Sequence, residues 1–349
     1  MNVPQQDAST RPAKKSSNYL WIIFATFFVA IILFTVYWFV ASHYIKKGVL
    51  NWMSEQEAQG FQIQHQGVGI AGFPYRFELN VQSPKVTTPD TKWTWSTDRL
   101  QIVMQSYNFN HYIAYAPGKH IATDHLNKVT YTSQMDGFAA SYSQSNSKVK
   151  RLSIVAKSMQ STAQSSKDGA SESLSFINPH FHMSPMPDQA DDMRLLIGFD
   201  TLSLSSPIPD AEFLGNDIGP LSAPIAIKQG MKLLEQGGPL DFLITQFDPA
   251  IVTPITQFKW GPLEVKAKTE GIKVDTAHKP AGMLNIRLEN IPDLRNALEK
   301  AGKLDDEKKA ALTLAEGMMK QEDAYLPINF TGGKVKILFQ DVAELDPLY

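Results

Sequence analysis

His180 and His182, separated by one residue, form the pattern in this sequence that comes closest to a metal site. On a β-strand their side chains would share one face, a spacing that can ligate zinc or copper. A third ligand would have to come from the nearby acidic residues Asp188, Asp191 and Asp192. Two surface histidines beside prolines are the commoner arrangement, and we therefore predict no metal ligands.

The glycine-rich stretch Gly67–Gly72 has the spacing G-x-G-x-x-G, which binds dinucleotides when a helix follows it. Here Phe73 and Pro74 follow, and then a strand pattern, so no helix N-terminus would face a pyrophosphate. We interpret these glycines as a bend between two strands.

Signatures of the common enzyme classes are missing. The sequence has no G-x-S-x-G, H-E-x-x-H or P-loop motif, and its clearest acidic cluster, Asp305–Glu307, begins a predicted helix. It has no cysteine, which excludes disulfides and cysteine nucleophiles and suits an oxidising envelope. A net charge of −2 offers no basic surplus for nucleic acid. We predict no catalytic residues, no cofactor and no nucleic-acid partner.

Arg76 lies within an alternating run, GFPYRFELNV. Phe73, Tyr75 and Phe77 would point to one side of a strand and Arg76 to the other. Arg76 could contact a lipid phosphate, although an arginine in this setting more often pairs with an acid such as Glu78 or faces water.

Two tryptophans, Trp93 and Trp95, share one face of a later expected strand. Together with the alternating aromatic residues they offer more apolar face than the few predicted helices would cover. We predict that they line an apolar ligand groove. The predicted lining is Phe73, Tyr75, Phe77, Trp93 and Trp95.

The element that positions the rest of the chain is Tyr19–Ser42, which contains no charged residue. A bilayer core needs roughly 20 apolar residues as a helix, so we predict one transmembrane span. Basic residues favour a cytoplasmic N-terminus, and the alternative, a cleaved signal peptide, fits less well because the apolar stretch is long. The basic residues are Arg11, Lys14 and Lys15 before the span and Lys46 and Lys47 after it.

These features divide the chain into four parts. We expect a disordered cytoplasmic tail at 1–18, the transmembrane span at 19–42, a juxtamembrane helix at 43–59 and a β-rich domain at 60–349 on the other side of the membrane. Ile45, Val49 and Trp52 would share the helix face that docks on this domain.

Alternating short strands dominate the domain, with helices in its C-terminal half. We predict helices around Ile227–Leu234, from Pro239 to Phe247, at Pro292–Ala301 and at Asp305–Lys320. We interpret Ser161–Ser171 as an exposed loop. The predicted class is α+β: an N-terminal transmembrane helix followed by an extensive, curved, mostly antiparallel sheet.

Several segments resemble the bacterial family called domain of unknown function 2125: WMSEQEAQGF, GVGIAGFPYRFEL, WTW, WGPLEVKAKTEGIKVD with AGMLNIRLEN, and LPINFTGGKVKI with LDPLY. They cover most of Val49–Tyr349, while Asn127–Ala190 carries little that matches. The resemblance implies an envelope protein anchored in the inner membrane and supplies no catalytic residues. The layout is also similar to that of AsmA-type envelope proteins that hold lipids.

We predict a single-pass inner-membrane protein whose periplasmic sheet binds or shields an apolar ligand such as lipid. The first alternative is a scaffolding module of an envelope complex, and the second is an enzyme whose active site has no sequence signature. A deep apolar groove would favour ligand binding over the scaffolding module, and a cluster of polar side chains converging in a cleft would favour the enzyme.

Overall fold

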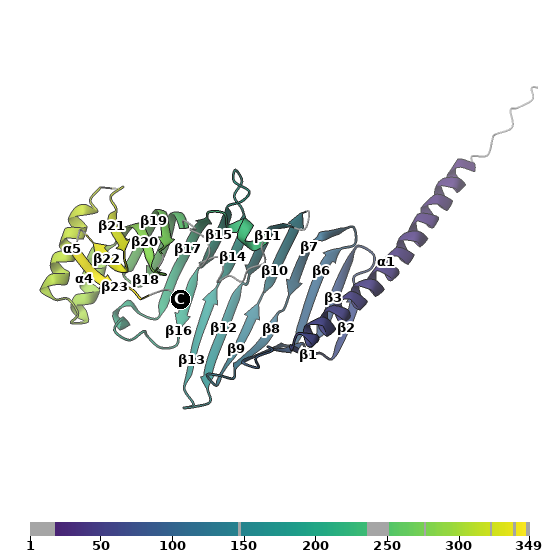
Figure 1. The fold of residues 1–349 in the computed structure, drawn as a ribbon, viewed down its shortest axis with the longest axis horizontal. Coiled ribbons are helices and arrows are strands. Elements are labelled where there is room, and N and C mark those ends of the chain that lie inside the picture. Colours follow the sequence, from purple (N-terminus) through teal and green to yellow (C-terminus); the bar gives the residue numbers. More distant parts are fainter. Residues whose placement is uncertain are drawn as a thin grey trace, which may run out of the picture.

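A computed structural model of the chain describes residues 18–145, 148–235, 251–275, 277–321, 323–337 and 340–346. Within them, a long N-terminal helix leads into one 23-stranded sheet, whose pairings are all antiparallel, and helices follow in the C-terminal half (Figure 1). The predicted α+β class is confirmed. All but the last residue of the predicted tail, and the predicted helix Pro239–Phe247, lie outside the described residues.

Helix α1 (Asn18–Ala58) runs without a break. Its most apolar stretch has a mean hydropathy of 2.5 and is not buried, so α1 is long and apolar enough to cross a membrane. Its N-terminal half projects away from the sheet, and its C-terminal half lies against the sheet's first strands (Figure 1). The docked face contains Trp38, Ala41 and Ile45, whereas Trp52 is 54% exposed, so its predicted docking role is wrong.

The sheet is an up-and-down meander of long strands, each interrupted once near its middle. The halves on one side of the interruptions form what we call the first wall, and the other halves form the second wall. Strand β17 (Asp217–Ile227) pairs with the last strand of both walls. The first wall contains, in spatial order, β2 (Gly67–Ala71), β3 (Arg76–Gln82), β6 (Arg99–Gln105), β7 (Asn108–Tyr115), β10 (Ala139–Ser145), β11 (Lys148–Val155), β14 (His180–Pro185) and β15 (Met193–Phe199). The second wall contains β1 (Gln62–Gln64), β4 (Lys85–Thr87), β5 (Trp93–Thr97), β8 (Gly118–Asp124), β9 (Val129–Asp136), β12 (Ser158–Ser165), β13 (Ser171–Ile177) and β16 (Thr201–Leu204).

The interruptions have a local cause. Ser83, Gly137 and Asn178 adopt left-handed φ angles of 46°, 63° and 51°, which turn the chain out of its extended path. Neighbouring interruptions bond to one another: the Ser83 amide donates to the Asp98 carbonyl at 2.8 Å, and the Asn178 amide donates to the Lys157 carbonyl at 2.9 Å. They therefore form a continuous line across the sheet, which we call the bend line.

One face of the first wall carries an unbroken apolar row. At a strand spacing of about 4.8 Å, a row across nine strands extends roughly 38 Å. The alternate positions of the same strands carry polar residues such as Glu78, Ser141 and His182, so the two faces differ in polarity. The row consists of directly paired residues Ile70, Leu79, Ile102, Ala114, Ala140, Ile154, Phe181, Ile197 and Ala223.

Helices cover this face in places. At the N-terminal end Trp38 of α1 packs on Phe77 and Met104. Farther along, Met231 of the short helix α2 (Gly230–Glu235) packs on Met183 and Met193.

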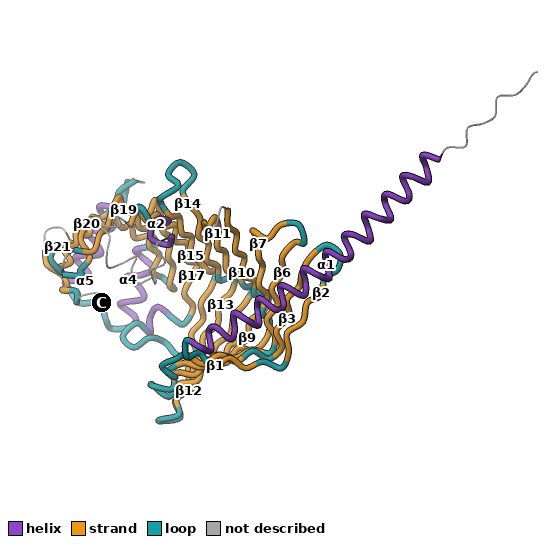
Figure 2. The backbone as a smooth tube through the Cα atoms, turned by 45° about the vertical axis from the view of Figure 1, so that its right-hand side comes forward, coloured by secondary structure: helices purple, strands orange, loops and turns teal. Residues whose placement is uncertain are grey.

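The C-terminal end of the sheet has its own core, where two helices pack against strands (Figure 2). This core buries Leu214, Ile291, Leu294, Leu312, Ala315, Met319 and Leu326. Its elements are η1 (Glu212–Leu214), β18 (Ile251–Trp260), β19 (Leu263–Val274), β20 (Pro280–Glu289), α4 (Ile291–Lys300), α5 (Asp306–Met318), β21 (Leu326–Thr331), β22 (Lys334–Ile337) and β23 (Gln340–Glu344).

The two predicted C-terminal helices are confirmed as α4 and α5. Asp305 caps α5, accepting a hydrogen bond from the Lys308 amide at 2.7 Å. The helical spacing of Ala311, Leu314, Ala315 and Met318 predicts a buried stripe on α5. Ala315 is buried as this spacing predicts, but the other buried residues are Leu312 and Met319, and Leu314 is exposed, so the buried face is rotated slightly from the predicted one.

Two other predictions are wrong in part. Of the predicted exposed loop Ser161–Ser171, residues 166–170 form an exposed turn, but Ser161–Ser165 belong to strand β12 and Ser171 begins β13. The Thr162 and Ser173 hydroxyls hydrogen-bond across this strand pair at 2.9 Å. Ile227, expected in a helix, ends strand β17, because the strand pairs on both of its edges and α2 starts only at Gly230.

Candidate functional site

An apolar pocket of about 400 Å³ lies along the bend line, on the face that carries the apolar row. Side chains from both walls meet there, and almost every surface they present is apolar. The first wall contributes Ile154, Phe181, Ile197 and Phe199, the second wall Met135, Met159 and Phe176, and the bend line Phe138.

The pocket is exposed. Ile154 is 36% and Ile197 is 37% exposed among the described residues, although both point to the same side of the sheet as the helices that cover its ends. Phe176 and Phe199 meet edge to face across the bend, with ring centroids 5.3 Å apart, and so fix the two walls relative to each other.

Polar groups on the same face of the second wall bond to one another. The Ser133 and Ser161 hydroxyls lie 2.9 Å apart. His120 is buried, and its Nε2 lies 2.7 Å from the Ala116 carbonyl oxygen. Within the described residues, the buried polar side-chain atom without a partner is Nε of Arg295, which does not line the pocket. The pocket therefore offers shape and an almost wholly apolar surface.

The predicted groove residues lie nearer to α1 than this pocket does. Phe77 is fully buried beneath Trp38. Phe73 and Tyr75 lie in the turn before β3 and are 48% and 77% exposed, so the strand alternation begins only after them. Arg76 pairs with Glu78 on the opposite face of the strand from Phe77.

The two predicted tryptophans lie on β5 in the second wall. Trp93 stacks on Tyr131 at 6.1 Å, and Trp95 lies 5.9 Å from the ring of His120. The structure thus brings Phe73 and Phe77 together at α1 and places the tryptophans in the other wall.

Sequence reasoning missed the pocket residues themselves. Nothing in the sequence says that Phe181 is the cross-strand neighbour of both Ile154 and Ile197. The pairing register of the strands brings these residues together, and that register depends on the meander as a whole.

His180 and His182 are neighbours, as their spacing requires, with ring centroids 5.6 Å apart. Burial, helped by the nearby His180 and Arg151 charges, lowers the pKa of His182. Within the described residues no group of three histidine or acidic side chains could hold a metal ion. The Gly67–Gly72 stretch forms strand β2 and the turn to β3, as predicted.

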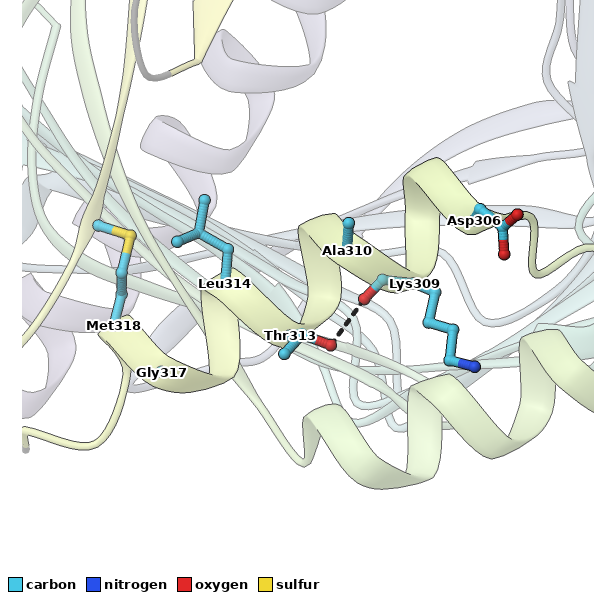
Figure 3. A pocket seen from close by; sticks show the side chains of 7 residues that line it. All are labelled: Asp306, Lys309, Ala310, Thr313, Leu314, Gly317 and Met318. Carbon is cyan, nitrogen blue, oxygen red and sulfur yellow. Dashed lines mark hydrogen bonds between the residues drawn. The ribbon is translucent and has the colours of Figure 1, made fainter.

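A hollow of about 730 Å³ lies along α5 (Figure 3). All of its lining residues belong to this one helix, so it is an open surface between exposed side chains. Its hydrogen bond joins Thr313 to the Lys309 carbonyl at 2.8 Å within the helix. No polar groups converge from separate elements, and we do not assign it as a site.

Residues 38–346 match the family described as "Uncharacterized protein conserved in bacteria (DUF2125)". No curated protein matches the chain. No solved structure matches it either.

Proposed function

The chain belongs to the DUF2125 family of bacterial proteins, and from its geometry we propose that it is a membrane-anchored envelope protein that holds the acyl part of a lipid. The apolar pocket at the bend line carries this proposal. Its walls are aliphatic and aromatic, and its inward isoleucines are partly exposed. An acyl chain would cover that surface and gain about 0.8 kcal/mol for each buried methylene group.

Anchoring supports the same proposal. Helix α1 has the length and composition of a membrane span, and it leads directly into the sheet. We propose that α1 crosses the inner membrane with the sheet in the periplasm, since the basic residues Arg11, Lys14 and Lys15 outnumber Lys46 and Lys47. Such a protein would be anchored next to lipid, in keeping with a role in envelope maintenance.

Adjacent residues of β15 provide a matched test. Ile197 lines the pocket and Leu196 points to the opposite face of the first wall. The full chain, Ile197→Asn and Leu196→Asn would be purified in the same mild detergent, and lipid extracted with organic solvent would be measured by mass spectrometry. We expect the full chain and Leu196→Asn to retain a stoichiometric lipid that Ile197→Asn loses.

Lipid that surrounds α1 would be retained equally by all three proteins, so only the difference at residue 197 reports on the pocket. Equal lipid in both variants, with unchanged melting temperatures, would overturn lipid binding. The sheet would then be better explained as a scaffolding surface of an envelope complex.

A further inference from the structure

Two hairpin turns of the first wall meet at the point where α1 leaves the sheet. The turn between β2 and β3 ends at Tyr75, and the turn between β6 and β7 contains Ser106. Both the amide and the hydroxyl of Ser106 donate to the Tyr75 carbonyl, at 3.1 and 3.0 Å. The Tyr37 hydroxyl of α1 donates to the Ser106 carbonyl at 2.8 Å, and Trp38 Nε1 donates to the Arg76 carbonyl at 3.1 Å. The helix and both turns therefore form one bonded unit.

This unit presents aromatic side chains to its surroundings. We call Phe73, Tyr75, Tyr107 and Phe109 the tip cluster; they are 48%, 77%, 76% and 40% exposed. Phe39 of α1 is 59% exposed and stacks on Phe73 at 5.9 Å, which joins the cluster to the helix surface.

The tip cluster is also free of charge. No charged residue occurs in 70–75 or in 100–110, which together contain both turns. Tyrosine and other amphipathic aromatic residues favour the headgroup region of a bilayer, where the ring is partly apolar and the hydroxyl stays hydrated. A surface of this composition fits a lipid headgroup layer better than water.

The length of α1 indicates where the headgroup layer lies relative to the tip cluster. Tyr19 and Tyr37 are eighteen residues apart in sequence, which is about 27 Å along a helix and close to the roughly 30 Å of a hydrocarbon core. If Tyr19 lies at one interface, Tyr37 lies at the other. Because Tyr37 is bonded to Ser106, no spacer separates the tip cluster from the membrane surface.

We propose that the tip cluster inserts into the headgroup region of the leaflet from which α1 emerges toward the sheet. It forms a second membrane contact, which fixes the tilt of the sheet and sets the first wall against the lipid surface. This inference rests on the proposed anchoring by α1 and is independent of any ligand in the pocket.

The chain has no cysteine, so a single introduced cysteine can carry a unique polarity-sensitive fluorophore. We would label Tyr75→Cys and Tyr107→Cys separately in the full chain, because each variant keeps the other aromatic residues of the cluster. Leu126→Cys, in the β8–β9 turn of the second wall and 66% exposed in the parent chain, is the matched control. Ile32→Cys reports on the span itself. The proteins would be reconstituted into phosphatidylcholine vesicles with and without brominated acyl chains.

We expect labels at 75 and 107 to shift to shorter emission wavelength and to lose intensity in brominated lipid, as the label at 32 does, while the label at 126 does neither. The quenching should persist in high salt, because the tip cluster is uncharged. If the label at 32 is quenched but those at 75 and 107 behave like that at 126, the tip contact is wrong and the anchoring stands. A label at 32 that stays in water overturns both, and quenching that disappears in high salt overturns insertion of the aromatic residues.

Discussion

The indole of Trp38 stacks on the ring of Phe77, with centroids 5.3 Å apart and planes 21° from parallel. Trp38 is 4% and Phe77 is 0% exposed, so each side chain completes the burial of the other. Because the same indole also donates to the Arg76 carbonyl, one residue of α1 binds the helix to the first wall by packing and by a hydrogen bond.

Trp38→Ala should lower the free energy of unfolding by about 3 kcal/mol or more, since it removes a large buried aromatic residue and leaves a cavity beside Phe77. Phe28→Ala, on the exposed part of α1, should change it by less than about 0.5 kcal/mol. Denaturant unfolding of the full chain in detergent, followed by near-UV circular dichroism, measures both. Similar losses from the two variants would contradict the role given to Trp38.

Phe77→Asp should be far more costly than Arg76→Ala. The first buries an unpaired carboxylate at a fully buried position, at a cost of about 3 kcal/mol or more. The second removes an exposed partner of Glu78, worth about 0.5 kcal/mol. Melting temperatures of the two variants give the comparison, and equal shifts would mean that the faces of β3 are assigned wrongly.

Arg287 should hold the end of α5 to the sheet. Its guanidinium donates to the carbonyls of Met319, Gln321 and Ala324 at 3.2, 2.7 and 3.2 Å. Arg287→Leu should cost about 2 kcal/mol, because it leaves these acceptors with fewer partners.

Arg287→Lys should restore little of that loss, because an ammonium group cannot reach several diverging acceptors as a planar fork does. Hydrogen exchange of the amides near Met319 measures the local effect for both variants. Full protection in the lysine variant would show that charge, and not the fork geometry, holds the helix end.

Stability should fall at mildly acid pH because of His182. Burial lowers its pKa below the ordinary 6.5, and the neighbouring His180 and Arg151 side chains lower it further. The folded chain therefore binds this proton less readily than the unfolded chain. The contribution of His182 to the free energy of unfolding is fully present above pH 6.5 and is lost as the pH falls through the lowered native pKa. Melting temperatures between about pH 7.5 and about pH 5.5 should fall less in His182→Gln than in the parent chain. Parallel curves would show that His182 does not contribute.

The amphipathic strands and helices could be predicted from the sequence, because each carries its own signal. The alternation of Phe77, Leu79 and Val81 is a buried face at period two, and all three residues are buried. Helices α4 and α5 follow from an early proline and from the acidic start at Asp305. Such signals depend only on residues close in sequence.

The polar strand β12 of the second wall and the pocket could not be predicted in this way. Residues such as Thr162 and Ser173 show no apolar alternation, and they form strands because their hydroxyls and backbones find partners in neighbouring strands. Whether Ile154 faces Phe181 depends on the register in which strand β11 pairs with strand β14, and no local sequence signal sets that register. The kink at Asn178, a single left-handed residue, decides where one wall ends, and a residue of that type fits a turn equally well.

Each bent strand pairs with the strand that precedes it and the strand that follows it in the chain, from β1 and β2 to β17. The length of the apolar row is therefore additive: one more bent hairpin inserted within the meander would lengthen it by about 10 Å without changing the pairing at either end. Synthesis from the N-terminus delivers α1 first, so the sheet can grow outward from that end, with every new strand adding to an edge that is already in place. The number of hairpins thus sets the length of the apolar row, and that length can change by duplication of a short segment.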